Sequence, residues 1–346
     1  MTTLRGPQGR PEQSRGATVA QIGERALIER ITSRVTSPPW VIVGPGDDAA
    51  VIEPEPRTLD VLTTDAQVEG IHFDRRFCPP DAIGHKALAV NLSDLAAMGA
   101  SPRAALLSLV VPEDLAVADV DGLLDGLLAL AARHRVALVG GNIARTTGPL
   151  VVDVTAIGSV GPRRVLRRGG ARPGDLVFVT GSIGRGVVGL RALQAASGAL
   201  PPDLEEAAAH YLRPEPRVRA GLLLGRNRAA SACMDLSDGL ADAVRQVAEA
   251  SGVGIAIDAA ALPIDGAVQR WFAQHRADPA AAAVSGGDDY ELLFTVRPSF
   301  RGRLRGVARL LGGLPITRIG VATKERQLVL KTADGERELP TGFQHF

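Results

Sequence analysis

Residues 86–100 of this chain read KALAVNLSDLAAMGA. Apolar residues recur there at helical spacing, and Gly99 is a typical residue just past a helix end, so we expect a helix over residues 82–98. Asn91 and Asp94 are three positions apart and project from nearly the same side of that helix. Almost all neighbouring residues are small or apolar, and an isolated buried carboxylate costs several kcal/mol. We therefore expect Asp94 to be paired or to bind a cation rather than to cap a turn.

Four further segments likewise place carboxylates beside small or hydroxyl residues and next to an apolar run. They are Asp47-Asp48, Thr63-Thr64-Asp65, Asp235-Leu236-Ser237-Asp238 and Asp288-Asp289-Tyr290-Glu291. Carboxylates that gather in a fold raise one another's pKa unless a cation lies between them. Mg²⁺ prefers carboxylate oxygens and keeps waters and substrate phosphates in its shell. The sequence therefore predicts a metal–phosphate site assembled from distant segments.

Each segment also has a simpler interpretation. Gly44-Pro45-Gly46-Asp47 is typical of a surface turn, and an Asp at the end of a strand, as expected for Asp65, is more often a cap. Ser237 or Asp238 would serve as a helix N-cap, although capping explains one polar residue of that segment and not three. His72 is either structural or a phosphate or substrate contact. Gly140-Gly141-Asn142 would let backbone amides approach a phosphate.

A rival signal is Gly184-Arg185-Gly186-Val187-Val188-Gly189, which matches the dinucleotide-binding fingerprint between an expected strand and helix. That fingerprint also requires an acidic residue about 20 residues further on, at the end of the next strand. The sequence there is Ala199-Leu200-Pro201-Pro202, and no Walker loop is present. Any nucleotide site is therefore expected to use neither the dinucleotide-binding fingerprint nor a Walker loop.

Length and composition limit the class of protein. The 346 residues exceed the roughly 250–300 that one core supports, so we expect two domains. A net charge of +1 removes the electrostatic case for nucleic acid, and no apolar run approaches the roughly 20 residues of a membrane helix. The only cysteines, Cys78 and Cys233, match no zinc spacing and fit a reducing cytoplasm.

Strands and helices intermingle along the chain, and several connections read as strand pairs. We therefore expect an α/β protein of the α+β type, with two mixed α/β domains rather than one doubly wound sheet. Residues 1–17 lack the apolar run of a secretory signal and are expected to form a loose tail. A stretch rich in Arg, Gly and Pro, residues 163–175, marks the predicted boundary between an N-terminal domain, 18–165, and a C-terminal domain, 166–346.

Together these segments resemble those of the thiamine-monophosphate kinases, in the superfamily of aminoimidazole ribonucleotide synthetase. The matching segments, which span the chain from about residue 19 to its end, are Gly46-Asp47-Asp48, Thr63-Thr64-Asp65, Gly70-Ile71-His72-Phe73, residues 86–100, residues 235–240 and residues 285–292. The resemblance implies ATP-dependent phosphorylation of thiamine monophosphate to thiamine diphosphate in the cytoplasm. It also implies an N-terminal domain that binds ATP and Mg²⁺ and a homodimer in which these domains pair their strands.

The resemblance assigns roles to individual residues. The implied Mg²⁺ ligands are Asp48, Thr63, Thr64, Asp65, Asp94, Asn142, Asp235 and Asp238. The implied ATP contacts are Gly141, Asn142, Arg168 and Ser237, and the implied thiamine contacts are His72, Asp288 and Phe343.

Two residues depart from the pattern of that family. The family commonly has Gly-Gly-Asp-Thr where this chain has Gly140-Gly141-Asn142-Ile143. Asn142 keeps one oxygen ligand but loses a charge, so one metal is expected to bind more weakly or through water. Asp288 stands where Glu is frequent, which shortens its reach to the substrate.

Two other classes of function remain open from the sequence. One is another member of the superfamily with a similar ATP site, such as a selenophosphate synthetase or the hydrogenase maturation dehydratase. Selenophosphate synthetases usually carry a reactive Cys or selenocysteine near the N-terminus, whereas no cysteine precedes Cys78 here. The other class is a non-catalytic sensor of divalent cations or nucleotides, which the loss of an acid at Asn142 suggests.

Overall fold

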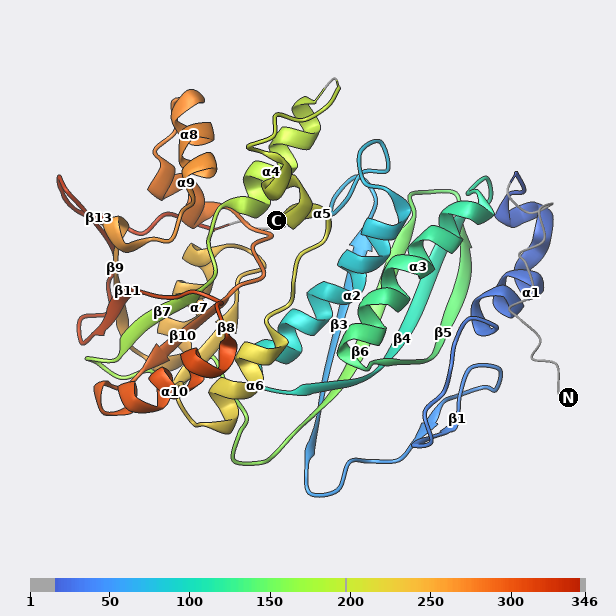
Figure 1. Ribbon diagram of the computed structural model, residues 1–346, viewed down its shortest axis with the longest axis horizontal. Helices are drawn as coiled ribbons and strands as arrows, with labels where there is room; N and C mark the ends of the chain where they lie inside the picture. Colours follow the sequence, from blue (N-terminus) through green and yellow to red (C-terminus); the bar gives the residue numbers. More distant parts are fainter. Residues whose placement is uncertain (1–15, 197, 343–346) are drawn as a thin grey trace, which may run out of the picture.

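Two β-sheets, each with its own helices, lie side by side in the structure, a computed structural model that describes residues 16–196 and 198–342 (Figure 1). The N-terminal sheet has the order β3-β6-β4-β5, and the C-terminal sheet has the order β13-β12-β9-β11-β7-β10-β8. The N-terminal strands are β3 (Leu59–Val68), β4 (Ser101–Pro112), β5 (Ala137–Thr146) and β6 (Val151–Val160). The C-terminal strands are β7 (Leu176–Thr180), β8 (Ala232–Asp235), β9 (Gly254–Asp258), β10 (Leu292–Val296), β11 (Ile316–Thr323), β12 (Leu328–Thr332) and β13 (Gly335–Glu338). The prediction of mixed α/β architecture in both halves is confirmed.

Helices α2 (Pro80–Ala97) and α3 (Val117–His134) cover one face of the N-terminal sheet (Figure 1). The helix expected over residues 82–98 is α2, and it is buried on all sides, with Asp94 the one half-buried residue between Ala82 and Ala97. Glycines let α3 approach it closely, since a Cβ at Gly84 would lie 1.8 Å from the carbonyl oxygen of Leu123. The remaining elements of this half are α1 (Val19–Thr32) and the hairpin of β1 (Val41–Val43) and β2 (Val51–Ile52).

Strand β3 is longer than expected. The sequence suggested that it ends at Asp65, but it pairs with β6 as far as Val68. Because side chains alternate along a strand, Thr63 and Asp65 face the helix α2, and Thr64 faces the opposite side of the sheet. The predicted ligands Thr63 and Thr64 therefore lie on opposite faces of the sheet.

In the C-terminal half, neighbouring strands are antiparallel except for the parallel pair β9 and β12. Its helices are α4 (Arg185–Ala195), α5 (Glu205–Leu212), α6 (Val218–Arg226), α7 (Leu240–Ser251), α8 (Gly266–Gln274), α9 (Pro279–Ser285) and α10 (Arg301–Leu311). The predicted boundary at residues 165 and 166 falls in the connection between β6 and β7 and stays a prediction. Of the predicted tail, residues 1–15 lie outside the described residues, whereas the carbonyl of Ala17 accepts a hydrogen bond from the amide of Val117 at 2.9 Å.

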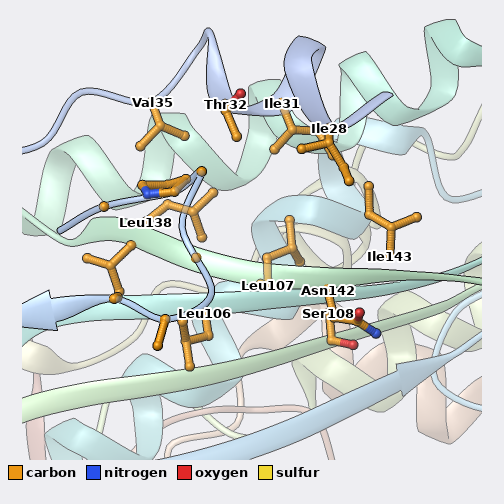
Figure 2. A pocket seen from close by; sticks show the side chains of 18 of the residues that line it. Ile28, Ile31, Thr32, Val35, Leu106, Leu107, Ser108, Leu138, Asn142 and Ile143 are labelled. Atoms are coloured by element: carbon orange, nitrogen blue, oxygen red, sulfur yellow. The ribbon is translucent and has the colours of Figure 1, made fainter. Parts of the chain in front are cut away.

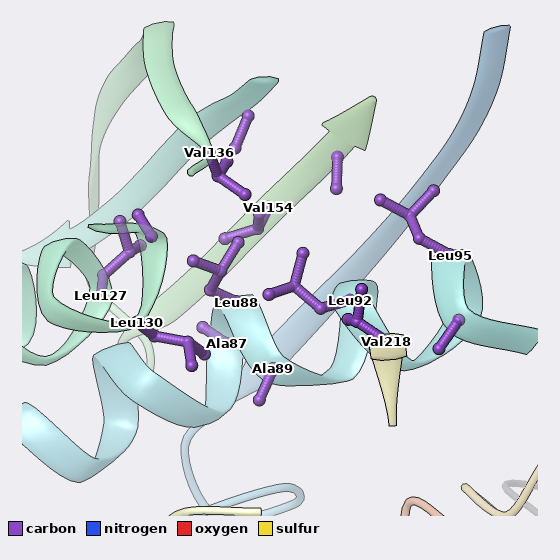
Figure 3. Close-up of a cluster of buried hydrophobic side chains, with 14 of the residues drawn as sticks. Ala87, Leu88, Ala89, Leu92, Leu95, Leu127, Leu130, Val136, Val154 and Val218 are labelled. Atoms are coloured by element: carbon purple, nitrogen blue, oxygen red, sulfur yellow. The ribbon is translucent and has the colours of Figure 1, made fainter. Parts of the chain in front are cut away.

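One hydrophobic core crosses from the first half into the second. Leu88, Leu92 and Leu95 of α2 pack there with Leu130 of α3 and with Val218 of α6 (Figure 3). Fully burying a side chain of this size contributes about 1.5–3 kcal/mol. Helix α2 is therefore held between the two domains, and the position of Asp94 on it is fixed from both sides.

Candidate functional site

A cavity of about 510 Å³ lies between the two domains. The N-terminal domain contributes residues of β3, the loop after it and α2, and the C-terminal domain contributes the loops that follow β8 and α9. We call it the interdomain cavity, and its predicted site residues are Asp65, His72, Asp94, Asp235, Ser237, Asp238 and Asp288. Seven predicted residues from five distant segments therefore meet in one place.

Burial raises the pKa of three carboxylates of this cavity. Burial raises the pKa of Asp65 to about 7, and the neighbouring charge of Asp94 adds to the effect. Asp235 is 3% exposed, and burial followed by the charge of Asp94 raises its pKa to about 7 as well. Burial also raises the pKa of Asp94. Carboxylates in this state favour a cation between them.

Hydroxyl groups and one arginine partly offset this repulsion. Thr63 donates a hydrogen bond through Oγ1 to Asp94 Oδ2, and Ser93 Oγ donates to Asp235 Oδ2 at 2.7 Å. The charge of Arg168 opposes the rise of the pKa at Asp94 and at Asp235. Arg168 itself is exposed and donates a hydrogen bond to Gln246 Oε1 at 2.6 Å.

The predicted thiamine contacts face the same cavity from opposite domains. His72 follows β3, and its Nδ1 accepts a hydrogen bond from the amide of Val68 at 3.1 Å. Asp288 adopts a left-handed backbone conformation with φ of 64°, and its Oδ1 accepts a hydrogen bond from the hydroxyl of Tyr290 at 2.9 Å. Phe343 lies outside the described residues, although Gly342 before it lines the cavity.

A second pocket of about 910 Å³ lies between α1 and the N-terminal sheet (Figure 2). We call it the sheet-face pocket. Asp48, Gly141 and Asn142 line it, and Asn142 is the cross-strand neighbour of Ser108. Thr64 lies on the sheet face that carries this pocket, since its Oγ1 donates a hydrogen bond to Asp153 Oδ1 at 3.1 Å. Of the eight predicted metal ligands, four line the interdomain cavity, Asp48 and Asn142 line the sheet-face pocket, and Thr63 and Thr64 line neither.

The composition of the sheet-face pocket includes an acid that the sequence analysis missed. Asp153 lines the pocket and is paired with Ser108 across the strands, so Ser108 lies between Asp153 and Asn142. The sequence contains a signal for this acid, because Asp153 interrupts the apolar strand Val151-Val152-Asp153-Val154. Asp153 supplies a formal charge close to the place where Asn142 lacks one.

The described residues contain no group of three or more His, Cys, Asp and Glu side chains that would hold a metal ion by themselves. Mg²⁺ commonly binds through one or two carboxylates and keeps its waters and substrate phosphates. The raised pKa values of Asp65 and Asp235 and the oxygen-only side chains around them fit that mode of binding. The interdomain cavity is therefore suited to a divalent cation that arrives with a phosphate group.

Two acids of the last predicted segment serve the fold instead of the cavity. Asp289 is fully buried and accepts hydrogen bonds from the amides of Gly184, at 2.8 Å, and Gly186, at 3.1 Å. Glu291 is buried and pairs with Arg217 through Nε at 2.7 Å. The sequence pattern placed this segment among those predicted to build the metal–phosphate site, but Asp289 and Glu291 have their partners within the fold. Asp289 also occupies the amides of Gly184 and Gly186 in the dinucleotide-like fingerprint.

Comparison with known proteins agrees with this geometry. Residues 46–160 match the family described as AIR synthase related protein, N-terminal domain, and residues 172–332 match the corresponding C-terminal domain. A thiamine-monophosphate kinase of Bacillus subtilis is 36% identical over 325 residues, which cover 92% of this chain and 98% of that protein. The chain belongs to the thiamine-monophosphate kinase family.

Solved structures of this family have the same fold. The crystal structure of thiamine-monophosphate kinase from Stenotrophomonas maltophilia is 39% identical with a TM-score of 0.79, covering 91% of this chain and 96% of that one. The structure described as AaThiL complexed with AMPPCP and TMP is 33% identical with a TM-score of 0.75, covering 94% and 97%. The resemblance seen in the sequence motifs is therefore confirmed over nearly the whole chain.

Proposed function

We infer that this protein phosphorylates thiamine monophosphate to thiamine diphosphate with ATP as phosphate donor. The observation that carries this function is the crowding of Asp65, Asp94 and Asp235 at one wall of a cavity that also presents His72 and Asp288. The relative AaThiL was solved with AMPPCP, an ATP analogue, and TMP, which supports the same pair of substrates for this chain.

The chemistry requires little from the protein beyond charge and position. A phosphate monoester has a second pKa of about 6 and is largely dianionic at neutral pH, so the attacking oxygen needs no general base. The difficulty is that two anions must approach in line. Bound Mg²⁺ would neutralise this repulsion and stabilise the charge that develops during the transfer.

We propose specific roles for the predicted site residues, beginning with those of the interdomain cavity. Asp65, Asp94, Asp235 and Asp238 would hold Mg²⁺, with Thr63 orienting Asp94 through its hydrogen bond. Arg168 and Ser237 would bind phosphate oxygens of ATP. His72, Asp288 and Phe343 would contact the thiamine compound.

The residues of the sheet-face pocket have a supporting role in this proposal. Asp48, Gly141 and Asn142 would contact ATP and its Mg²⁺ from that pocket, and Thr64 would do so from the neighbouring strand through the side that it shares with Asp153. Their contribution to turnover should be smaller than that of the cavity acids, since Asp48, the one charged residue among them, is exposed to water, which screens its charge more strongly.

We also propose a homodimer formed through the N-terminal domains. Strand β3 has ten residues, stands at the edge of its sheet and exposes Leu59 and Leu62 at 48% and 67%. A long, apolar edge strand is a natural place for pairing with a second copy. Sedimentation equilibrium should give twice the 36.1 kDa of the chain, and a single-chain mass at micromolar concentration would contradict the dimer.

We propose a cytoplasmic location, supported by the two buried cysteines, Cys78 and Cys233, which form no disulfide. Among the helices in the described residues, none is long and apolar enough to cross a membrane.

The reaction is tested by incubating the protein with ATP, Mg²⁺ and thiamine monophosphate and measuring thiamine diphosphate and ADP. Equal amounts of both products, and none in the presence of a chelator, are expected. ADP without thiamine diphosphate would indicate a different acceptor within the superfamily. Tight binding of ATP with neither product formed would indicate a sensor.

A further inference from the structure

Lys86 is one of three lysines in the chain and is almost completely buried, with 4% of its surface exposed. It lies on α2, upstream of Asp94, and it does not line the interdomain cavity. Burying an ammonium group is costly unless the charge is paired and hydrogen-bonded. Its surroundings therefore have to supply partners, and those partners are residues of the cavity wall.

The ammonium group of Lys86 joins the two predicted thiamine contacts. Its Nζ lies 3.1 Å from Asp288 Oδ1 and donates a hydrogen bond to the backbone carbonyl of His72 at 3.4 Å. It also lies 3.9 Å from the centre of the Tyr211 ring, within the range of a cation–π contact. One positive charge thus connects a loop of the N-terminal domain with a loop of the C-terminal domain.

Two tyrosines donate hydrogen bonds to the same two acceptors as Lys86, one tyrosine to each acceptor. Tyr211 donates its hydroxyl hydrogen to the carbonyl of His72 at 3.1 Å, and Tyr290 donates to Asp288 Oδ1 at 2.9 Å. Burial raises the pKa of both tyrosines, so both hydroxyls keep the proton that they donate. The His72 carbonyl and Asp288 Oδ1 therefore each have two donors, and Lys86 is the donor that they share.

Asp288 needs such support because of its backbone. Its φ of 64° lies in the left-handed region, where a non-glycine residue is strained. Its amide donates to the carbonyl of Ser237 at 2.8 Å, and the Lys86 and Tyr290 contacts fix its side chain through Oδ1. This arrangement leaves Asp288 Oδ2 to meet a group of the substrate.

We propose that Lys86 is a positioning residue for the acceptor substrate, a phosphorylated thiamine. It acts by holding Asp288 and the loop of His72 at a fixed distance from each other across the domain boundary. This inference rests on the proposed function. It assigns Lys86 to binding of the acceptor and not to binding of ATP.

The test compares Lys86→Met, which keeps the length of the stem and removes the charge, with Lys331→Met at an exposed lysine paired with Glu336. Loss of a buried charged partner should raise the KM for thiamine monophosphate about tenfold in Lys86→Met and leave the KM for ATP within about twofold. Lys331→Met should change neither constant. Lys86→Arg restores the charge and should recover part of the affinity for the acceptor.

A second variant separates positioning from folding. Tyr290→Phe removes one hydrogen bond to Asp288 Oδ1, keeps the ring, and should raise the same KM by a smaller factor. If Lys86→Met does not fold, an unchanged KM for thiamine monophosphate in Tyr290→Phe overturns the proposal.

The outcomes also distinguish this inference from the proposed function. A wild-type protein that makes thiamine diphosphate, with a Lys86→Met variant whose two KM values are unchanged or rise equally, overturns the inference alone. A wild-type protein that makes no thiamine diphosphate overturns the function and the inference with it.

Discussion

The two faces of the N-terminal sheet differ in how far they bury the acidic and hydroxyl side chains of the predicted site. On the face under α2, Thr63 and Asp65 lie beside Asp94 in a buried wall, where desolvation raises the pKa of both acids. On the other face, Thr64 reaches Asp153 beside a larger pocket, and Asp48 there is exposed. Burial is the difference, because a desolvated carboxylate depends on a cation far more than a hydrated one does. The acids of the predicted site can therefore differ greatly in their contribution to activity.

The largest effect should come from Asp94→Asn. Loss of one buried carboxylate from the cation site should lower kcat by at least about 100-fold at saturating Mg²⁺. The free energy of unfolding should not fall, because the substitution removes a desolvated charge. Steady-state kinetics and urea unfolding measure the two quantities.

Asp48→Asn provides the matched change on the other face, and its loss of kcat should be clearly smaller than that of Asp94→Asn. Equal losses of kcat in the two variants would remove the distinction between the pockets.

A buried acid that faces no cavity tests the effect of burial by itself. Burial raises the pKa of Asp289 from 3.8 to about 8. The folded protein therefore holds this proton more tightly than the unfolded chain does. The stability that the protonated group provides is present below pH 3.8 and is lost as the pH rises toward about 8. The free energy of unfolding should fall by up to about 1.4 kcal/mol per pH unit in this window.

Asp289→Asn removes this titration and keeps one oxygen, which can accept a hydrogen bond from one of the two amides, those of Gly184 and Gly186, at the start of α4. Urea unfolding between pH 5 and 8, in roughly half-unit steps, should give a shallower pH dependence for this variant than for the wild type. Parallel curves for the two proteins would show that Asp289 is already ionised throughout the window.

Thr63 and Thr64 allow the two faces to be compared with the same substitution. Thr63→Val removes the hydroxyl that donates to Asp94, and kcat should fall about tenfold because a charged acceptor loses its donor. Thr64→Val removes contacts to Asp153 and should change kcat less. Valine has a high strand propensity and nearly the same shape, so both variants should keep the strand. A larger loss of kcat in Thr64→Val would place the essential chemistry on the face of the sheet-face pocket.

The smallest effect should come from Asn142→Asp. This change adds a carboxylate to the sheet-face pocket, near Asp48 and Asp153. An extra charged ligand should lower the Mg²⁺ concentration needed for half-maximal activity about threefold. The Mg²⁺ dependence of the initial rate measures it, with Asn227→Asp at a partly buried site outside both pockets as the control. A higher Mg²⁺ requirement in Asn142→Asp would mean that repulsion from Asp153 outweighs the added ligand.

Much of the fold was predictable because its signals are local. The helical spacing of residues 82–98 predicted α2, and the apolar runs predicted most strands. The end of β3 was missed because the polar segment Thr63-Thr64-Asp65 reads as the end of a strand, whereas pairing with β6 continues it to Val68. Such pairing depends on a partner 90 residues away, which no local pattern contains.

The candidate site shows the same limit. Acids beside small residues identified Asp65, Asp94 and Asp235, which do share one cavity. The same pattern also selected Asp289 and Glu291, whose partners, Gly184 and Arg217, lie more than 70 residues away. The sequence alone does not distinguish an acid that pairs with a distant residue of the fold from an acid that binds a ligand.

The sequence by itself determined the family, the mixed α/β class and the set of acids from which a cation site is built, since residue type and spacing carry that information. Only the tertiary structure decided which acids are desolvated, which face of β3 each residue occupies and that Lys86 links Asp288 to the His72 loop. The physical reason is that burial and charge pairing depend on neighbours in space, and most of those neighbours are far apart along the chain.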